Sequence, residues 1–268
     1  MTTKPEIHLY TANTMNGWKP LIFLHEAGID YDMTAVRFAK REQKAEAYMK
    51  LNPNGRIPTI VDRGNNDFVV FETGAILWYL AEKYRKFLSP EPDLKSETLQ
   101  WLMFQMSAVG PMMGQAMFFQ RIARPNGDDE PYSIARYVNE SRRLLEVLDR
   151  RLDGREFLVG DAYSIADMAT YPWARSHIWA GVSVAGLDSL NAWFERIDAM
   201  PKTQAALELP EPRPAVFGRG DIEEAAHQRT ELPGSELTCP GDVHVARWSV
   251  SAACRVLCDR GYGQQLLE

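Results

Sequence analysis

Apolar and polar residues follow two different periods along the first part of the chain. Short runs rich in β-branched and aromatic residues predict strands, whereas apolar residues that recur every third or fourth position predict helices. The predicted strands are 7–10, 31–38, 57–62 and 68–71. The predicted helices are 18–27, 41–50 and 72–84. This order of elements predicts a small mixed sheet with helices packed on it.

The strand pattern ends at a linker, 86–96, in which two prolines stand among charged residues. Only helical periods follow. A capping box, Ser164-Ile-Ala-Asp167, begins one of these helices, and Gly110-Pro111 predicts a kink in another. This part is therefore predicted to be an all-helical bundle. Its predicted helices are 97–119, 131–152, 165–180, 187–199 and 201–207.

The composition changes again at Pro210, where closely spaced prolines and glycines precede a charged run. The spacing at 246–258 is compatible with a short amphipathic helix, but most of this tail is expected to be poorly ordered. We therefore expect three parts. These are an α/β domain at 1–88, an all-α domain at 89–209 and an extension at 210–268.

Composition limits the classes of partner. Apolar residues make up 45% of the chain and charged residues 25%, as in an ordinary soluble globular protein. A net charge of −6 argues against a nucleic acid as partner. No apolar run is long enough to span a membrane, and Met1–Glu6 has no apolar core of a secretory signal. We expect a cytoplasmic protein with no nucleic-acid or membrane partner.

The cysteines are more informative by position than by number. They stand at 239, 254 and 258, so no residue before 239 can supply a thiol. Any redox chemistry in the first two parts must borrow sulfur from a ligand. The five histidines show no spacing typical of metal ligands, and we expect no metal.

The stretch Asn52-Pro-Asn-Gly-Arg-Ile-Pro58 combines turn-forming residues with a proline at the start of a strand. The Ile57–Pro58 bond has two interpretations. It is either an ordinary trans bond at a strand edge or a cis bond that turns the backbone groups of Ile57 toward a ligand.

A second motif, Phe71-Glu-Thr-Gly74, stands where a strand passes into a helix. The free N–H groups and positive dipole end at Thr73 suit a carboxylate, and Glu72 suits an ammonium group. Together they match the two charges of an α-amino-acid headgroup. A plain helix cap is an equally good reading.

These two motifs and three further stretches resemble glutathione transferases over residues 5–209. The resemblance is to the nu class, which is related to the yeast nitrogen-regulator prion protein. It implies a thioredoxin-like N-terminal domain, an all-α C-terminal domain and a homodimer. The further stretches are Thr14-Met-Asn-Gly17, Leu99-Gln-Trp-Leu102 and Gly110-Pro-Met-Met-Gly-Gln115.

The resemblance also implies roles for particular residues. Glu72 and Thr73 would hold the γ-glutamyl end of glutathione, and Ile57 before a cis Pro58 would bond to the cysteinyl unit. Thr14 and Asn16 would be the catalytic pair that faces the sulfur. Gln43 and Arg56 would lie near the glycyl carboxylate, and Arg136 would reach the ligand from the neighbouring subunit.

A hydroxyl and an amide suit this task because hydrogen bonds to a thiolate lower the pKa of the thiol, and the thiolate is the nucleophile. Tyr10 is the other candidate near the sulfur, but its place within a strand favours a packed tyrosine. We expect glutathione-dependent disulfide reductase activity with reduced or disulfide glutathione and a small hydrophobic or disulfide co-substrate. The alternative is a non-catalytic regulatory or ligand-binding protein on the same scaffold.

Overall fold

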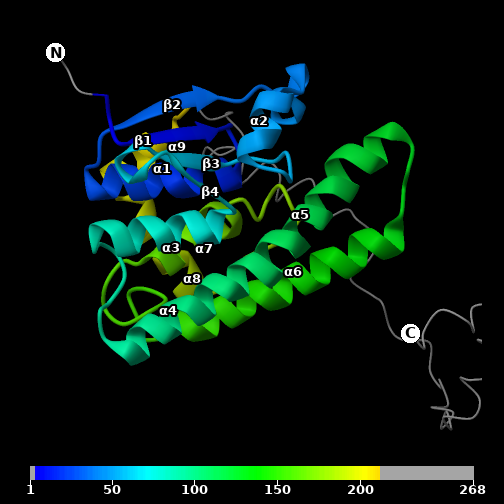
Figure 1. Ribbon diagram of the computed structural model, residues 1–268. Helices are drawn as coiled ribbons and strands as arrows, with labels where there is room; N and C mark the ends of the chain where they lie inside the picture. Colours follow the sequence, from blue (N-terminus) through cyan, green and yellow to red (C-terminus); the bar gives the residue numbers. More distant parts are fainter. Residues whose placement is uncertain (1–3, 212–268) are drawn as a thin grey trace, which may run out of the picture. The chain divides into compact units, whose positions relative to one another are not determined.

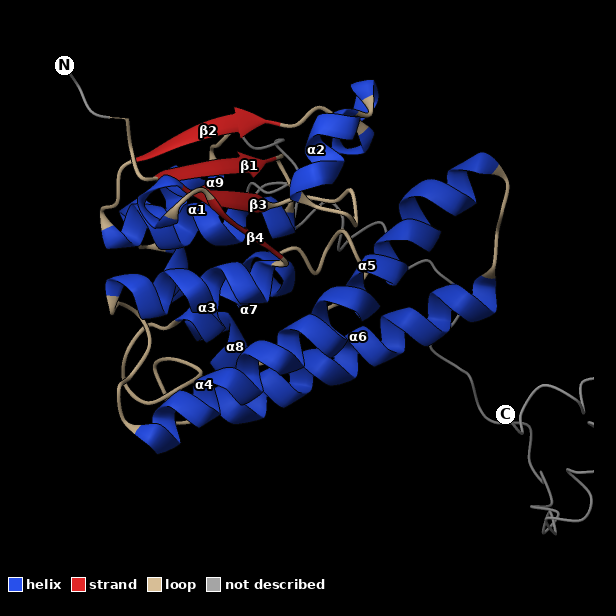
Figure 2. Ribbon diagram, viewed as in Figure 1, coloured by secondary structure: helices blue, strands red, loops and turns tan. Residues whose placement is uncertain are grey.

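A four-stranded mixed sheet forms one side of the described part of the protein (Figures 1 and 2). The structure is a computed structural model that describes residues 4–211. The strand order is β2-β1-β3-β4, in which β1 and β2 are parallel and the other two pairs antiparallel. The mixed sheet confirms the predicted thioredoxin-like class. The strands are β1 (Ile7–Thr11), β2 (Tyr31–Ala35), β3 (Thr59–Asp62) and β4 (Phe68–Phe71).

Two helices cover the inner face of this sheet, namely α1 (Met15–Ala27) and α3 (Thr73–Tyr84). Burial alternates along β1, so that Ile7 and Leu9 are fully buried while their neighbours are half exposed. Helix α1 begins three residues before its predicted start, because Thr14 caps it.

The predicted helix at 41–50 is wrong in its first half. Two short 3₁₀ turns precede α2 (Glu46–Leu51), and Arg41 between them adopts a left-handed conformation with φ of 53°. A residue in that conformation cannot continue a right-handed helix.

The all-α prediction for the following part is confirmed. Helices α4 and α5 join through a π turn at Gln105–Val109, and this helical run lies along α6 (Figure 2). The irregularity precedes Gly110-Pro111, because Pro111 lacks the N–H that a regular helix would need there. The helices are α4 (Pro92–Phe104), α5 (Gly110–Phe118), α6 (Pro131–Leu152), α7 (Ile165–Arg175), α8 (Asp188–Asp198) and α9 (Pro201–Leu207).

Helix α1 joins the α/β part to the helical part. It packs against α3 on one side and against α7 and α9 on the other, so one continuous apolar core runs through both parts. None of the helices within residues 4–211 is both long enough and apolar enough to cross a membrane. The tail expected beyond residue 211, its possible helix at 246–258 and all three cysteines lie outside the described residues.

The predicted capping box at the start of α7 is present. The Ser164 hydroxyl accepts a bond from Ala166 N at 3.3 Å, and Asp167 Oδ2 accepts from Ser164 N at 3.0 Å. Asp167 is fully buried, and its Oδ1 also accepts from Leu158 N at 2.9 Å and Trp193 Nε1 at 3.0 Å. One carboxylate therefore ties three segments together. Burial raises the pKa of Asp167, and these hydrogen bonds oppose the rise.

Replacing Asp167 by alanine leaves several buried donors without a partner. We expect Asp167→Ala to lower the free energy of unfolding by about 3 kcal/mol. Urea denaturation followed by tryptophan fluorescence measures the change. The matched control is Asp161→Ala, in the exposed part of the same loop, for which we expect a change within about 0.5 kcal/mol. Equal losses in the two variants would contradict this role for Asp167.

Candidate functional site

A cleft lies where the first turn of α1 and the start of α3 meet α5 and α7. It consists of two adjoining cavities of about 590 Å³ and about 790 Å³. Both are large enough for a small-molecule ligand. The two cavities share five lining residues, which are Asn16, Arg56, Gly114, Phe118 and Trp173.

Seven of the nine residues predicted for the site line this cleft. Pro58 is buried and lines neither cavity. Arg136 lies exposed on α6 and also lines neither cavity. The structure therefore brings the seven together, and the roles assigned to them stay predictions. The seven are Thr14, Asn16, Gln43, Arg56, Ile57, Glu72 and Thr73.

Thr14 is placed by its role as the N-cap of α1. Its Oγ1 accepts a hydrogen bond from Gly17 N at 3.0 Å, which leaves its own O–H proton for another acceptor. Gly17 allows a close approach: a Cβ on it would lie 1.9 Å from Ala12 O. The missing side chain lets the first turn of α1 sit directly on the end of β1.

The amide of Asn16 is oriented from the other part of the protein. Trp173 on α7 donates its Nε1–H to Asn16 Oδ1 at 2.8 Å. An indole N–H can only donate, so this contact identifies the oxygen of the amide. The N–H₂ group of Asn16 is then the part of the amide that can donate to a ligand in the cleft.

The turn before β3 is held by buried side chains. Asn52 Nδ2 donates to Arg56 O at 2.8 Å, and the Tyr48 hydroxyl donates to the same carbonyl at 2.7 Å. The Ile57–Pro58 bond is cis, which confirms the interpretation that the resemblance favoured. These contacts place Arg56 and Ile57 at the wall of the cleft.

Glu72 and Thr73 stand at the start of α3. Glu72 has φ of 69° and makes no capping hydrogen bond to the helix, so the plain-cap reading is wrong for its side chain. A non-glycine residue with positive φ costs of order 1 kcal/mol, and such residues cluster at binding sites. The Glu72 carboxylate is exposed at the cleft, whereas Thr73 is buried in its wall.

Lys19 and Gln105 also line the cleft, and sequence reasoning missed both. Lys19 Nζ donates to Gln105 Oε1 at 2.7 Å and to Thr73 Oγ1 at 3.2 Å. Burial lowers the pKa of Lys19 well below its usual value, and the charge of Glu72 opposes this shift. The available signal is a lysine between Trp18 and a run of apolar residues, but the helical period at 18–27 rests on the apolar positions alone.

Tyr10 does not belong to the site. It lies half buried in β1, stacked on His8 with ring centroids 4.5 Å apart, and lines neither cavity. Residues 4–211 contain no cluster of histidine, cysteine, aspartate or glutamate that could hold a metal ion.

Two family profiles match the chain. The profile "Glutathione S-transferase, N-terminal domain" matches residues 5–82, and "Glutathione S-transferase, C-terminal domain" matches residues 113–201. The disulfide-bond oxidoreductase YfcG of Escherichia coli is 41% identical over 205 residues, which cover 75% of this chain and 94% of that protein.

Solved structures give the same grouping. A glutathione transferase from Burkholderia graminis with two glutathione molecules bound per subunit has a TM-score of 0.74 and 39% identity, covering 77% of this chain and 89% of that chain. A glutathione transferase from Pseudomonas putida with one glutathione disulfide bound per subunit has a TM-score of 0.74 and 38% identity. The match covers 78% of this chain and 94% of that chain.

The close seating of Gly17 on β1 can be tested. A methyl group there meets a backbone carbonyl, so α1 must shift, and we expect Gly17→Ala to lower the free energy of unfolding by about 3 kcal/mol. Urea denaturation measures the loss. The control is Gly114→Ala, whose Cβ would meet Trp173 at an ordinary 3.4 Å. The change there should stay within about 1 kcal/mol, since alanine favours the helix. An unchanged Gly17→Ala variant would contradict the tight contact.

Proposed function

Since this chain belongs to the glutathione S-transferase family, we propose that it is a glutathione-dependent disulfide-bond reductase. The observation that carries the proposal is the convergence of seven predicted glutathione-site residues on one cleft. Because no cysteine stands before residue 239, a ligand must supply the sulfur. The oxidoreductase name of YfcG and the glutathione disulfide in the Pseudomonas putida structure support this reaction class.

The γ-glutamyl end of glutathione carries an ammonium group and a carboxylate. Glu72 presents a carboxylate at the cleft, and the first turn of α3 presents backbone N–H groups beside the Thr73 hydroxyl. The Glu72 carboxylate can therefore face the ligand ammonium group. The N–H groups at the start of α3 can face the ligand carboxylate, which the dipole of α3 also favours.

The remaining backbone of glutathione fits along the turn before β3. Ile57 offers its peptide groups to the cysteinyl unit, and Arg56 offers a guanidinium group to the glycyl carboxylate. Gln43 lines the same cavity beside them. Fixed contacts at both ends of the ligand hold its sulfur at a constant position.

Thr14 and Asn16 are the proposed catalytic residues because each has a donor to spare at the cleft. The Thr14 hydroxyl proton and the Asn16 N–H₂ group stabilise a thiolate and so lower the pKa of the bound thiol. Neither group carries a charge, so the sulfur stays nucleophilic rather than being held in an ion pair.

Two glutathione molecules balance the proposed reaction. The thiolate of the first attacks the disulfide of the co-substrate, forms a mixed disulfide and releases one thiol product. The thiolate of the second attacks the glutathione sulfur of that mixed disulfide. This step forms glutathione disulfide and releases the second thiol product, and the two protons of the glutathione thiols end on the two products.

The second cavity offers room for the co-substrate or for the second glutathione. Its wall is largely apolar, and Arg121 lies over the Trp179 ring at 4.3 Å. A small hydrophobic or disulfide compound fits this lining. The proposal includes a cytoplasmic setting, because the glutathione pool there is kept reduced. The apolar residues that line the second cavity are Met15, Phe38, Ile57, Met117, Phe118, Ile122, Trp173 and Trp179.

Asn16 offers a sharp test of the proposed thiolate contact. Asn16→Asp keeps the acceptor for Trp173 but replaces the N–H₂ donor by a negative charge. We expect kcat/KM for reduction of a small dialkyl disulfide by glutathione to fall about tenfold or more, and Asn16→Ala to fall similarly. The pKa of the bound thiol, followed by thiolate absorbance, should rise in both variants.

Asn139→Asp on the exposed face of α6 is the matched control and should leave both quantities unchanged. If the wild type binds glutathione but reduces no disulfide, the enzyme proposal fails and the non-catalytic binding protein takes its place.

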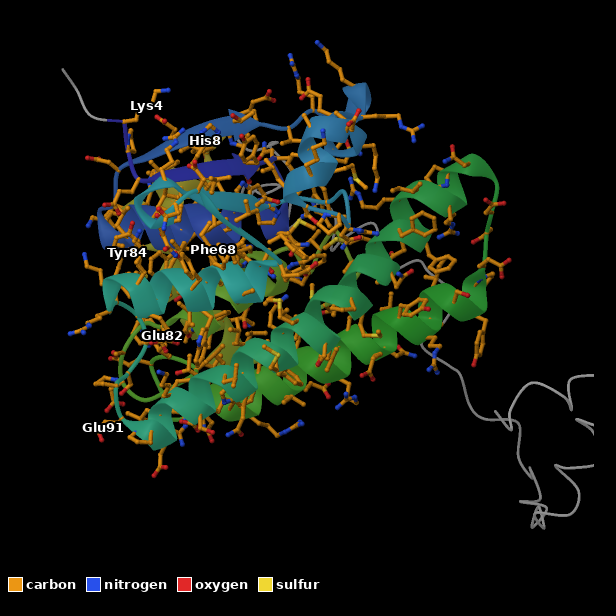
Figure 3. All side chains as sticks on the ribbon, viewed as in Figure 1. Lys4, His8, Phe68, Glu82, Tyr84 and Glu91 are labelled. Atoms are coloured by element: carbon orange, nitrogen blue, oxygen red, sulfur yellow. The ribbon has the colours of Figure 1, made fainter. Side chains whose placement is uncertain are left out.

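We also propose a homodimer. The edge strand β4 and helix α4 expose large apolar side chains, and monomers rarely expose such groups together. Phe68 on β4 is 49% exposed and Met103 on α4 is 47% exposed. Phe68 is labelled in Figure 3. Arg136 lies outside both cavities of its own chain, which suits a residue that reaches into the cleft of a neighbouring subunit.

Sedimentation equilibrium tests the dimer. We expect the wild type to sediment at twice the mass of one chain. Phe68→Glu places a charge in the proposed interface and should weaken dimerisation about tenfold or more. Lys202→Glu, at an exposed position on α9, is the control and should leave the dimer intact. A monomeric wild type would contradict the proposal.

A further inference from the structure

Lys19 is the most unusual charged residue in the described part of the protein. It lies on α1, only 1% of it is exposed, and it lines the cavity of about 590 Å³. A fully buried lysine is rare unless it is paired with an opposite charge. Its two hydrogen-bond partners, Gln105 Oε1 and Thr73 Oγ1, are both neutral.

Gln105 brings a second buried donor to the same place. It lies in the π turn between α4 and α5 and is completely buried. Its Oε1 accepts from Lys19, while its Nε2 has no hydrogen-bond partner among the described residues. Gly110 leaves room for this amide, because a Cβ there would lie 2.8 Å from Nε2. An unpaired buried donor is costly, and a ligand acceptor would remove that cost.

Thr73 links this pair to the ligand side of the cavity. Because its Oγ1 accepts from Lys19, its own proton must point elsewhere, and it is donated to Met106 Sδ at 3.3 Å. A thioether is a weak acceptor. A carboxylate at the start of α3 would be a much stronger acceptor for the same proton.

We propose that Lys19 and Gln105 form a buried recognition pair for the α-carboxylate at the γ-glutamyl end of the ligand. Lys19 supplies the countercharge and directs the Thr73 hydroxyl toward that carboxylate, and Gln105 holds the Lys19 ammonium in place. The inference rests on the proposed glutathione site and names what makes that site select a γ-glutamyl carboxylate. Lys19 and Gln105 act together from two different parts of the protein, α1 and the π turn.

The electrostatics of the cavity agree with this geometry. Burial alone disfavours the charged form of Lys19, and Glu72 is the nearby charge that opposes this effect. A ligand carboxylate beside Thr73 would add a second negative charge close to the ammonium. Coulomb attraction is strong in such a site because little water screens it.

The experiment compares two ligands on the full chain by isothermal titration calorimetry. One is glutathione, and the other is the analogue in which the γ-glutamyl α-carboxylate is replaced by hydrogen. We expect the wild type to bind glutathione about 10- to 100-fold more tightly than the analogue. In Lys19→Met, which keeps the length of the side chain, the preference for glutathione over the analogue should fall about fivefold or more, and the affinity for the analogue should not change.

Two further variants separate recognition from folding. Gln105→Glu supplies an internal carboxylate to Lys19, so it should keep the fold and also weaken the preference for glutathione about fivefold or more. Lys86→Met is the matched control, since Lys86 is exposed and donates to Ala27 O away from the cavity. It should leave the affinities for both ligands unchanged.

The ratio of the two affinities decides the outcome, because a residue with only a structural role would weaken both ligands alike. If Lys19→Met or Gln105→Glu folds and keeps the wild-type ratio, the recognition pair is overturned while the glutathione site stands. If Lys19→Met does not fold, the ratio measured in Gln105→Glu decides between the two outcomes. If the wild type binds neither ligand, the proposed function itself fails.

Discussion

The seating of the first turn of α1 on the end of β1 is the constraint on which the rest of the structure depends. Gly17 has no side chain to hold the turn away, and the Thr11 hydroxyl, fully buried, donates to Gly17 O at 2.9 Å. Thr14 caps this first turn of α1, and Asn16 lies within it. A shift of this turn would displace the donor groups of Thr14 and Asn16. It would also displace the buried Lys19, which lies one turn further along the same rigid helix.

Helix α1 also explains why the cleft needs both parts of the protein. It is covered by α3 on one side and by α7 and α9 on the other, so it is apolar nearly all round, as a buried helix should be. Two polar groups of this helix at the cleft are bonded across that boundary. Asn16 is bonded by Trp173 and Lys19 by Gln105, both from the helical part. The α/β part therefore supplies the donors, and the helical part fixes their direction.

Local sequence patterns predicted the sheet and the capping box, since each depends on neighbouring residues. The cis Ile57–Pro58 bond was implied only by the family resemblance, because the local pattern fits a trans bond as well. The resemblance implied seven residues of the cleft, six of which lie in the short contiguous motifs that carry it, with Gln43 outside them. Short motifs have a limit. They could not predict the bond between Asn16 and Trp173, which are 157 positions apart. Lys19 was missed for a related reason: a lysine in a helix usually extends its charge to water, and only tertiary packing shows that this one cannot. The left-handed Arg41 escaped because no residue type requires that conformation. Gly110-Pro111 predicted an irregularity in the helix, but not that it would take the form of a π turn.

The division of charges in the proposed site bears on its chemistry. Charged groups stand where the ends of the ligand would lie, with Glu72 and Lys19 at one end and Arg56 at the other. These ends are the same in glutathione and in its disulfide, so charge contacts bind both forms about equally and do not favour reaction. The neutral donors of Thr14 and Asn16 act differently from these charge contacts, because their hydrogen bonds are strongest when the sulfur carries a negative charge. Binding energy at the ends then holds the ligand in place, while the contacts at the centre favour the thiolate on which disulfide exchange depends.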